Sequence, residues 1–175
     1  MSKINVNTIG REEQLSSPKG TFQIERTCLT EKLADSDVER RRAPFDIDVV
    51  TIPPGKTDWP YHVHATGWEL YIAIKGTARM RLDDNYIEMA PGDSIQCAPG
   101  AAHQVINESD SPFIYWLVSS SPAFDTGYYP DSDKLTVTKV LGAPSDGLPE
   151  SGRSGSTTWT TFRQGATTDY WQGEE

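Results

Sequence analysis

The residues of this sequence that are best suited to chemistry are its histidines, of which there are three. His62 and His64 are two positions apart, so on a β-strand their imidazoles point to the same side and can reach one point in space. Glu69 follows a short segment that can turn the chain back beside this pair, and His103 comes from a separate hairpin. A lone histidine is more often an ordinary core or surface residue, so the prediction of a site depends on the four residues together.

Three imidazoles and one carboxylate form a donor set that suits a transition metal better than calcium or magnesium. We therefore predict that His62, His64, Glu69 and His103 bind one divalent transition metal, with iron, manganese, nickel and zinc as the candidates. Sequence alone does not choose among these metals.

Short strand-like segments, separated by turn residues, must position these side chains. Residues 77–82 show the pattern clearly, with Ala78, Met80 and Leu82 alternating with polar residues before the turn at Asp83. Helical periodicity is absent from this part of the chain, and closely spaced strands are typical of a β-sandwich or barrel. The candidate strands span residues 45–52, 68–75, 77–82, 86–89, 102–107 and 112–118.

The spacing of glycines, turn residues and metal-binding side chains resembles the double motif of the cupin family over roughly residues 45–120. The resemblance implies an all-β fold, a double-stranded β-helix or jelly-roll barrel, whose first motif supplies two histidines and a glutamate and whose second supplies the last histidine. Ala98 stands where the family has a proline, with Pro99 one place along. The matching residues run Gly55-x6-His62-x-His64-x4-Glu69-x6-Gly76, then Gly92, Pro99-Gly100-x2-His103-x3-Asn107.

The predicted organisation is a single domain in three parts. Residues 44–120 form the barrel core, residues 1–43 form an N-terminal extension that is partly strand, and residues 121–175 form a C-terminal extension that packs on the barrel. Within the first extension we expect residues 22–29 to add a strand to a sheet edge. The charged segment 31–42 suits either a short helix or a solvated loop, and the loop is the preferred prediction. Residues 142–156, rich in Gly, Ser and Pro, indicate a flexible connection to a strand-like segment near residues 157–162.

Strand parity nominates further site residues. Tyr71 shares the face of Glu69, so its hydroxyl could orient a metal site or relay a proton as a catalytic residue, or its ring could simply fill the barrel. Tyr61, with Trp59, could line the mouth, although both could equally be ordinary packing residues. Arg79 could bind an anionic substrate, although such an arginine more often lies on a solvated face. Asn107 belongs to the motif, and a structural hydrogen bond is preferred there over a role near substrate. Tyr61, Arg79 and Asn107 are thus the candidate substrate-binding residues.

The other face of segment 68–75 is apolar as well. Trp68, Leu70, Ile72 and Ile74 all point away from Glu69, and a strand that is apolar on both faces is covered on both faces. The cover could be the N-terminal segment, the C-terminal strand or a second subunit. We therefore predict a homodimer.

Composition excludes several classes of partner. The 175-residue chain carries a net charge of −9, with 16 Lys and Arg against 25 Asp and Glu, so it repels phosphate backbones and is not expected to bind nucleic acid. No apolar run reaches membrane-spanning length and the N-terminus lacks a signal peptide, which predicts a cytoplasmic protein without a membrane partner. The two cysteines, Cys28 and Cys97, are then expected to be free.

The resemblance implies a metal centre but leaves the reaction open, because cupins with this ligand set include dioxygenases, decarboxylases, isomerases and epimerases. Four protein ligands leave a five- or six-coordinate metal with an open position for a small molecule. We expect a metal-dependent enzyme acting on a small polar organic substrate, dioxygenase-type first and sugar or keto-acid isomerase or decarboxylase next. The alternative is a non-catalytic protein in which the metal anchors a small ligand or holds the barrel together.

Overall fold

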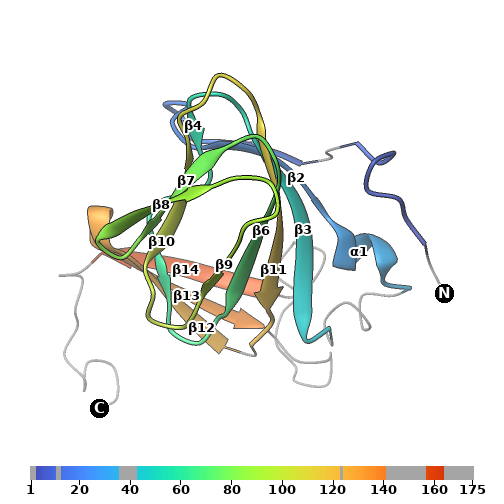
Figure 1. Ribbon diagram of the computed structural model, residues 1–175. Helices are drawn as coiled ribbons and strands as arrows, with labels where there is room; N and C mark the ends of the chain where they lie inside the picture. Colours follow the sequence, from blue (N-terminus) through green and yellow to red (C-terminus); the bar gives the residue numbers. More distant parts are fainter. Residues whose placement is uncertain (1–2, 11–12, 36–42, 123, 141–156, 164–175) are drawn as a thin grey trace, which may run out of the picture.

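The computed structural model describes residues 3–10, 13–35, 43–122, 124–140 and 157–163. Nearly all of the regular structure is antiparallel β-strand (Figure 1). The first half of the chain holds β1 (Glu13–Ser16), β2 (Gln23–Cys28), α1 (Leu29–Leu33), β3 (Phe45–Ile52), β4 (Lys56–Thr57), β5 (Val63–His64), β6 (Glu69–Lys75) and β7 (Ala78–Leu82). The second half holds β8 (Asn85–Met89), β9 (Ser94–Cys97), β10 (His103–Asn107), β11 (Phe113–Ser120), β12 (Phe124–Tyr129), the 3-10 helix η1 (Pro130–Ser132), β13 (Lys134–Val140) and β14 (Thr157–Arg163).

These strands form three sheets. The largest runs β1-β2-β3-β11-β6-β9, the second runs β4-β10-β7-β8, and the third runs β14-β13-β12-β5. Non-consecutive neighbours such as β3 with β11 and β7 with β10 bring distant segments together, as a jelly-roll barrel requires. The predicted all-β, double-stranded β-helix fold is confirmed.

Alternating residues of facing strands build the core between the first two sheets. Ala78 and Met80 of β7 are buried, as their alternation predicted, and they meet Phe113 and Tyr115 of β11 in one apolar cluster. Gly76 turns the chain between β6 and β7 with φ of +79°, and a Cβ atom there would lie 2.5 Å from the carbonyl oxygen of Pro112. Only glycine fits that close approach, which explains its place in the motif.

The residues before the barrel core add to its largest sheet. As predicted for residues 22–29, β2 pairs with the edge of β3, with Arg26 opposite Val50 and Cys28 opposite Asp48. The preferred loop at 31–42 is wrong for residues 31–33, which belong to α1, because Leu29 is buried and anchors this turn beside β3. Residues 36–42 lie outside the described part of the chain.

The predicted C-terminal strand is present as β14, which pairs along its whole length with β13. The flexible connection predicted at 142–156 lies outside the described residues, and the division into core and extensions stays a prediction. Cys28 and Cys97 form no disulfide bond within the described part of the chain. Among the described residues, no helix has the length and apolar character needed to cross a membrane.

The outward face of β6 keeps much of its apolar surface exposed. Trp68, just before the strand, is 48% exposed and Ile74 is 46% exposed. Leu70 and Ile72, between them on the same face, are half-buried. The prediction that the N-terminal segment, the C-terminal strand or a second subunit covers this face stays a prediction.

Candidate metal centre

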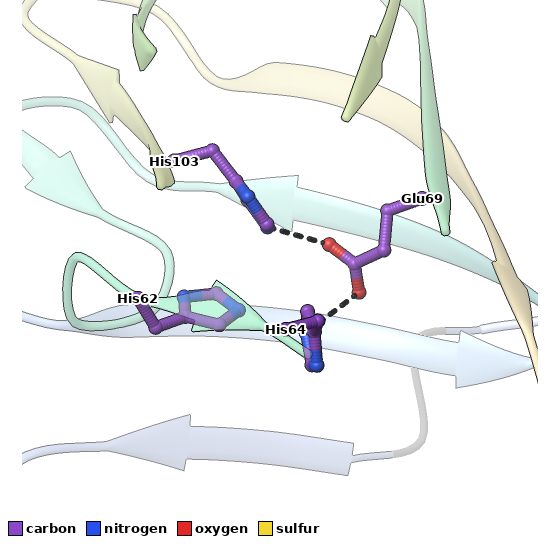
Figure 2. Close-up of side chains that lie close together, drawn as sticks. All are labelled: His62, His64, Glu69 and His103. Atoms are coloured by element: carbon purple, nitrogen blue, oxygen red, sulfur yellow. Dashed lines mark hydrogen bonds and ion pairs between the residues drawn. The ribbon is translucent and has the colours of Figure 1, made fainter. Parts of the chain in front are cut away.

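Four side chains converge at one end of the barrel interior. His62, His64, Glu69 and His103 each offer a ligand atom, and these atoms all lie within 4.8 Å of one another (Figure 2). Two ligands on opposite sides of a metal at about 2.1 Å would be roughly 4.2 Å apart, so the cluster is close to the size that a single ion needs. The structure thus brings together all four residues that the sequence nominated, and the cluster could bind a metal.

Backbone pairing between separate strands sets this convergence. His62, just before β5, and His103, at the start of β10, form an antiparallel bridge in which each amide N–H donates to the other's carbonyl, at 3.2 and 2.8 Å. Glu69 opens β6 and faces the same interior as Tyr71 and Ala73. The carboxylate of Glu69 contacts Nε2 of His103 at 2.8 Å and Nε2 of His64 at 3.6 Å.

Each histidine is oriented through its other ring nitrogen. With a proton on Nδ1, His62 donates to the carbonyl of Pro60 at 2.8 Å and His103 donates to the carbonyl of Ala101 at 2.9 Å. Nδ1 of His64 instead donates to a carboxylate oxygen of Asp125. Histidines anchored through Nδ1 have Nε2 turned toward the centre, where it can coordinate a metal once it carries no proton.

Asp125 is itself held in place from β12. Its Oδ1 accepts hydrogen bonds from the backbone N–H of Thr66 at 2.8 Å and from the hydroxyl of the same residue at 3.0 Å. Gly67 permits this arrangement, because a Cβ atom there would lie 3.2 Å from Cγ of His64 and 3.3 Å from Oδ2 of Asp125. Partial burial would raise the pKa of Asp125, but the hydrogen bonds from Thr66 and His64 lower it.

The pKa values show a cluster that keeps a positive charge beside Glu69. Burial would raise the pKa of Glu69, but its hydrogen bond with His103 and the charges of the histidines lower it to about 2. Burial opposes protonation of His103, yet hydrogen bonds with Cys97 and Glu69 raise its pKa to about 10. Burial and the charge of His103 lower the pKa of His62 to about 4. A buried carboxylate that already stabilises a cation suits a metal ion at the same place.

Tyr71 contacts Glu69 of the cluster from the interior of the barrel. The side chain is fully buried, and its hydroxyl donates to Oε2 of Glu69 at 2.6 Å. Ser119 of β11 donates to the other carboxylate oxygen at 3.3 Å. Burial and the neighbouring Glu69 carboxylate raise the pKa of Tyr71 well above its usual value, so it stays a neutral donor. It can therefore hold Glu69 in one orientation.

A cavity of about 320 Å³ opens beside the cluster. His62, His64 and Glu69 contribute to its wall, so a small molecule in the cavity would reach the metal-binding atoms. The largest sheet supplies most of the remaining wall, and Trp59 borders it as the sequence suggested. Its polar wall residues outside the cluster include Arg26, Asp46, Asp48 and Ser119.

The three candidate substrate-binding residues lie elsewhere. Tyr61 is buried, with its hydroxyl donating to the carbonyl of Asp83, and it is not part of the cavity wall. Arg79 forms an ion pair with Glu108 on the outer side of β7, the solvated position that its residue type favours. Asn107 is fully buried and bonds to backbone at the end of β10, which fits the structural role preferred for it. The structure does not bring these residues to the cluster.

The sequence did not nominate five residues of the site, which are Arg26, Asp46, Asp48, Ser119 and Asp125. Nothing in the sequence around Asp125 links it to His64. Asp48 shares one face of segment 45–52 with the apolar Val50, which is a weak signal that it turns inward. The opposite face is also apolar, so alternation alone does not tell which face of the strand is buried. Arg26 lies in the predicted edge strand, where its contact with the cavity depends on how the sheet closes.

Comparison with known proteins agrees with this architecture. A family model for the cupin domain matches residues 48–119. The glucose-6-phosphate isomerase of Thermococcus onnurineus is 30% identical over 131 residues, covering 63% of this chain and 69% of the relative. The corresponding enzyme of Thermococcus litoralis is 30% identical over 124 residues, covering 58% of this chain and 65% of the relative. A solved structure of a cupin-superfamily sugar phosphate isomerase from Silicibacter pomeroyi superposes with a TM-score of 0.71 at 20% identity over 95% of both chains, a likeness of fold.

Proposed function

This chain belongs to the cupin superfamily, and from that premise we propose that it is a metal-dependent isomerase acting on a small polyhydroxylated carbonyl compound. The observation that carries the proposal is the three-histidine, one-glutamate cluster opening into a cavity of about 320 Å³, a size suited to a sugar-like molecule. Both curated relatives described above are isomerases of a sugar phosphate.

This proposal reverses the order of reactions expected from the sequence. Dioxygenase chemistry stood first there, on the ligand set alone. None of the relatives described above is a dioxygenase, whereas all three are isomerases of sugar phosphates by name. The more general expectation, a metal-dependent cupin that acts on a small organic substrate, is retained.

The chain's own residues would divide the work as follows. His62, His64, Glu69 and His103 would hold the metal, which when bound acts as a Lewis acid toward the substrate carbonyl and its neighbouring hydroxyl. Tyr71 keeps Glu69 oriented from below, so that the carboxylate does not rotate away from the cluster. Isomerisation also needs a group to take a proton from the carbon next to the carbonyl and return it to the carbonyl carbon.

Asp46 is the proposed proton acceptor. It lies in the same cross-strand row as Glu69, with Ser119 between them, and it lines the same cavity. A carboxylate two strands from Glu69 can face a substrate that contacts the cluster, without being a member of the cluster itself. Asp46→Asn should therefore abolish turnover while the metal content stays unchanged.

The test is an isomerisation assay on metal-loaded protein. Aldoses and their phosphate esters are incubated with protein loaded in turn with iron, manganese, nickel or zinc, and ketose formation is followed by NMR. We expect turnover in wild-type protein, and loss of both turnover and stoichiometric metal in His62→Ala and His103→Ala. Arg81→Gln, which removes a surface ion pair with Asp131, is the control and should retain both. Stoichiometric metal without turnover of any aldose or ester would overturn the isomerase proposal.

A further inference from the structure

One part of the cavity wall carries polar groups that the metal cluster does not use. Arg26 comes from β2, Asp48 from β3, and Trp59 from the segment between β4 and β5. The guanidinium carbon of Arg26 lies 5.9 Å from the centre of the Trp59 ring, and Arg26 pairs with the residue two positions from Asp48 on the neighbouring strand. These three side chains form what we call the far wall of the cavity.

Asp48 is a buried carboxylate that lacks part of its hydrogen bonding. The residue is 6% exposed, and its Oδ1 atom has no hydrogen-bond partner among the described residues. Burial raises the pKa of Asp48 to about 6, although the positive charge of Arg26 opposes the shift. An unsatisfied buried acceptor is costly, so the cavity favours a ligand that supplies a donor there.

Arg26 supplies the complementary donors. Its Nε atom donates to Glu13 of β1 at 2.5 Å, while its terminal amino groups have no hydrogen bond to any described residue. The far wall therefore presents hydrogen-bond donors and an acceptor within one small region, beside an indole ring. Hydroxyl groups both donate and accept, and the C–H face of a sugar ring packs well on an aromatic side chain.

The charges of the cavity disfavour a phosphate group. Asp46, Asp48 and Glu69 line it, and Arg26 is the one Lys or Arg among the described lining residues. Glu13 already neutralises that guanidinium from the β1 side. A phosphate dianion placed against the far wall, away from the metal cluster, would face the carboxylate of Asp48 and a guanidinium that is already paired with Glu13, which disfavours its binding there.

We propose that the far wall is a subsite for hydroxyl groups, and that the substrate is a free sugar rather than its phosphate ester. This inference deepens the proposed function and depends on it for the reaction, but not for binding. Arg26 and Asp48 hold the end of the sugar away from the metal, and Trp59 packs against its ring. They determine specificity.

The test compares free sugars with their esters on the metal-loaded full-length protein. We expect kcat/KM for glucose, mannose or ribose to exceed that for the matching phosphate by about tenfold or more. Asp48→Asn and Arg26→Gln should each raise KM for the free sugar by about tenfold or more, with metal content unchanged. Arg81→Gln and Asp131→Asn, which break a surface pair of the same residue types, are matched controls and should change neither. Preference for the phosphate esters would overturn the subsite and leave the isomerase proposal standing.

Binding of unreactive sugar alcohols separates the two proposals. Isothermal titration of metal-loaded protein with xylitol, sorbitol and sorbitol 6-phosphate measures the far wall without any reaction. We expect the neutral alcohols to bind and Asp48→Asn to weaken them, even if no aldose is turned over. Trp59→Phe, which keeps an aromatic ring, should retain binding and guards against a variant that fails to fold. No binding of either alcohol, or tighter binding of the phosphate, would overturn the inference.

Discussion

Oδ2 of Asp125 lies 2.5 Å from Nδ1 of His64, although 61 residues separate the two in sequence. Pairing of β12 with β5, which sets Gly127 opposite His64, brings them together. His62 and His103 are anchored by backbone carbonyls, so His64 is the one histidine of the cluster whose anchor is a carboxylate. A charged partner makes an imidazole a stronger metal ligand and fixes its tautomer. The C-terminal part of the chain therefore supports the metal centre directly.

Replacing Asp125 by Asn should weaken metal binding without unfolding the protein. The amide keeps the shape of the side chain but removes the negative charge beside His64, and partners of this kind are worth about 10- to 100-fold in metal affinity. Competition with a chromophoric chelator measures the dissociation constant. Asp131→Asn, a surface carboxylate paired with Arg81, should leave that constant unchanged. An unchanged affinity in Asp125→Asn would show that Asp125 does not tune the site.

Substitution of Asn107 should lower stability rather than substrate affinity. Its Nδ2 atom donates to the carbonyls of Ile52 at 3.0 Å and Ser111 at 2.9 Å, and the side chain is fully buried. Asn107→Ala leaves these carbonyls unpaired, so we expect the free energy of unfolding to fall by about 2–3 kcal/mol in urea titrations. Asn85→Ala, at an exposed position of β8, is the control. A large rise in KM at unchanged stability would instead favour the substrate-binding role considered from sequence.

Asp58 should make the protein more stable as the pH falls toward 4. It is buried and accepts hydrogen bonds from the backbone of Val105 and the hydroxyl of Tyr115, yet burial outweighs these bonds and raises its pKa from 3.8 to about 7. The protonated form is favoured in the folded state, so its contribution is fully present below about pH 4 and is lost as the pH rises through about 7.

Urea unfolding at several pH values tests this assignment. Other groups titrate in the same range, so the useful quantity is the difference between wild type and Asp58→Asn, prepared with the same metal content. We expect the variant to gain stability relative to wild type as the pH rises from about 4 to about 7, because the substituted side-chain amide stays neutral throughout. A difference that does not change with pH would mean that Asp58 is ionised in the folded protein at all of these values.

The exposed apolar face of β6 should mediate a homodimer. Leu70 and Ile72 pair in register with Val118 and Trp116 of β11, and with Trp68 they form a continuous apolar surface on one side of the largest sheet. Light scattering after size exclusion should give the mass of a dimer at micromolar concentration, and Trp68→Arg should give a monomer. Tyr86→Arg, at a 56% exposed position on β8, should leave the mass unchanged. A monomeric wild type would contradict the prediction.

Strand parity predicted that His62 and His64 lie on one side of the chain, and the resemblance to the cupin double motif added Glu69 and His103 to the candidate metal cluster. The fold followed from the same motif and from the turn residues between short strands. The role of Asp125 could not be predicted from the sequence, because its position depends on the pairing of two strands that are far apart in the chain. The inward orientation of Asp48 depends on how β3 is buried between β2 and β11, which alternation alone does not determine.

Arg79 is a residue whose type suggested a function that its position in the fold does not support. Its residue type suits an anionic substrate, but β7 alternates so that the buried positions are Ala78 and Met80, and Arg79 is left to pair with Glu108 at the surface. Residue chemistry alone overestimates function when the face of the strand is not considered. The same parity argument, applied to both sides of a strand, places Tyr71 correctly beside Glu69.

The residues that surround the metal cluster come from both sides of the matched cupin region. The four residues of the candidate metal cluster fall within residues 48–119, whereas Arg26 precedes that region and Asp125 follows it. In evolutionary terms, a gene duplicate can alter the strand that carries Arg26 and acquire a new substrate while every histidine is inherited unchanged.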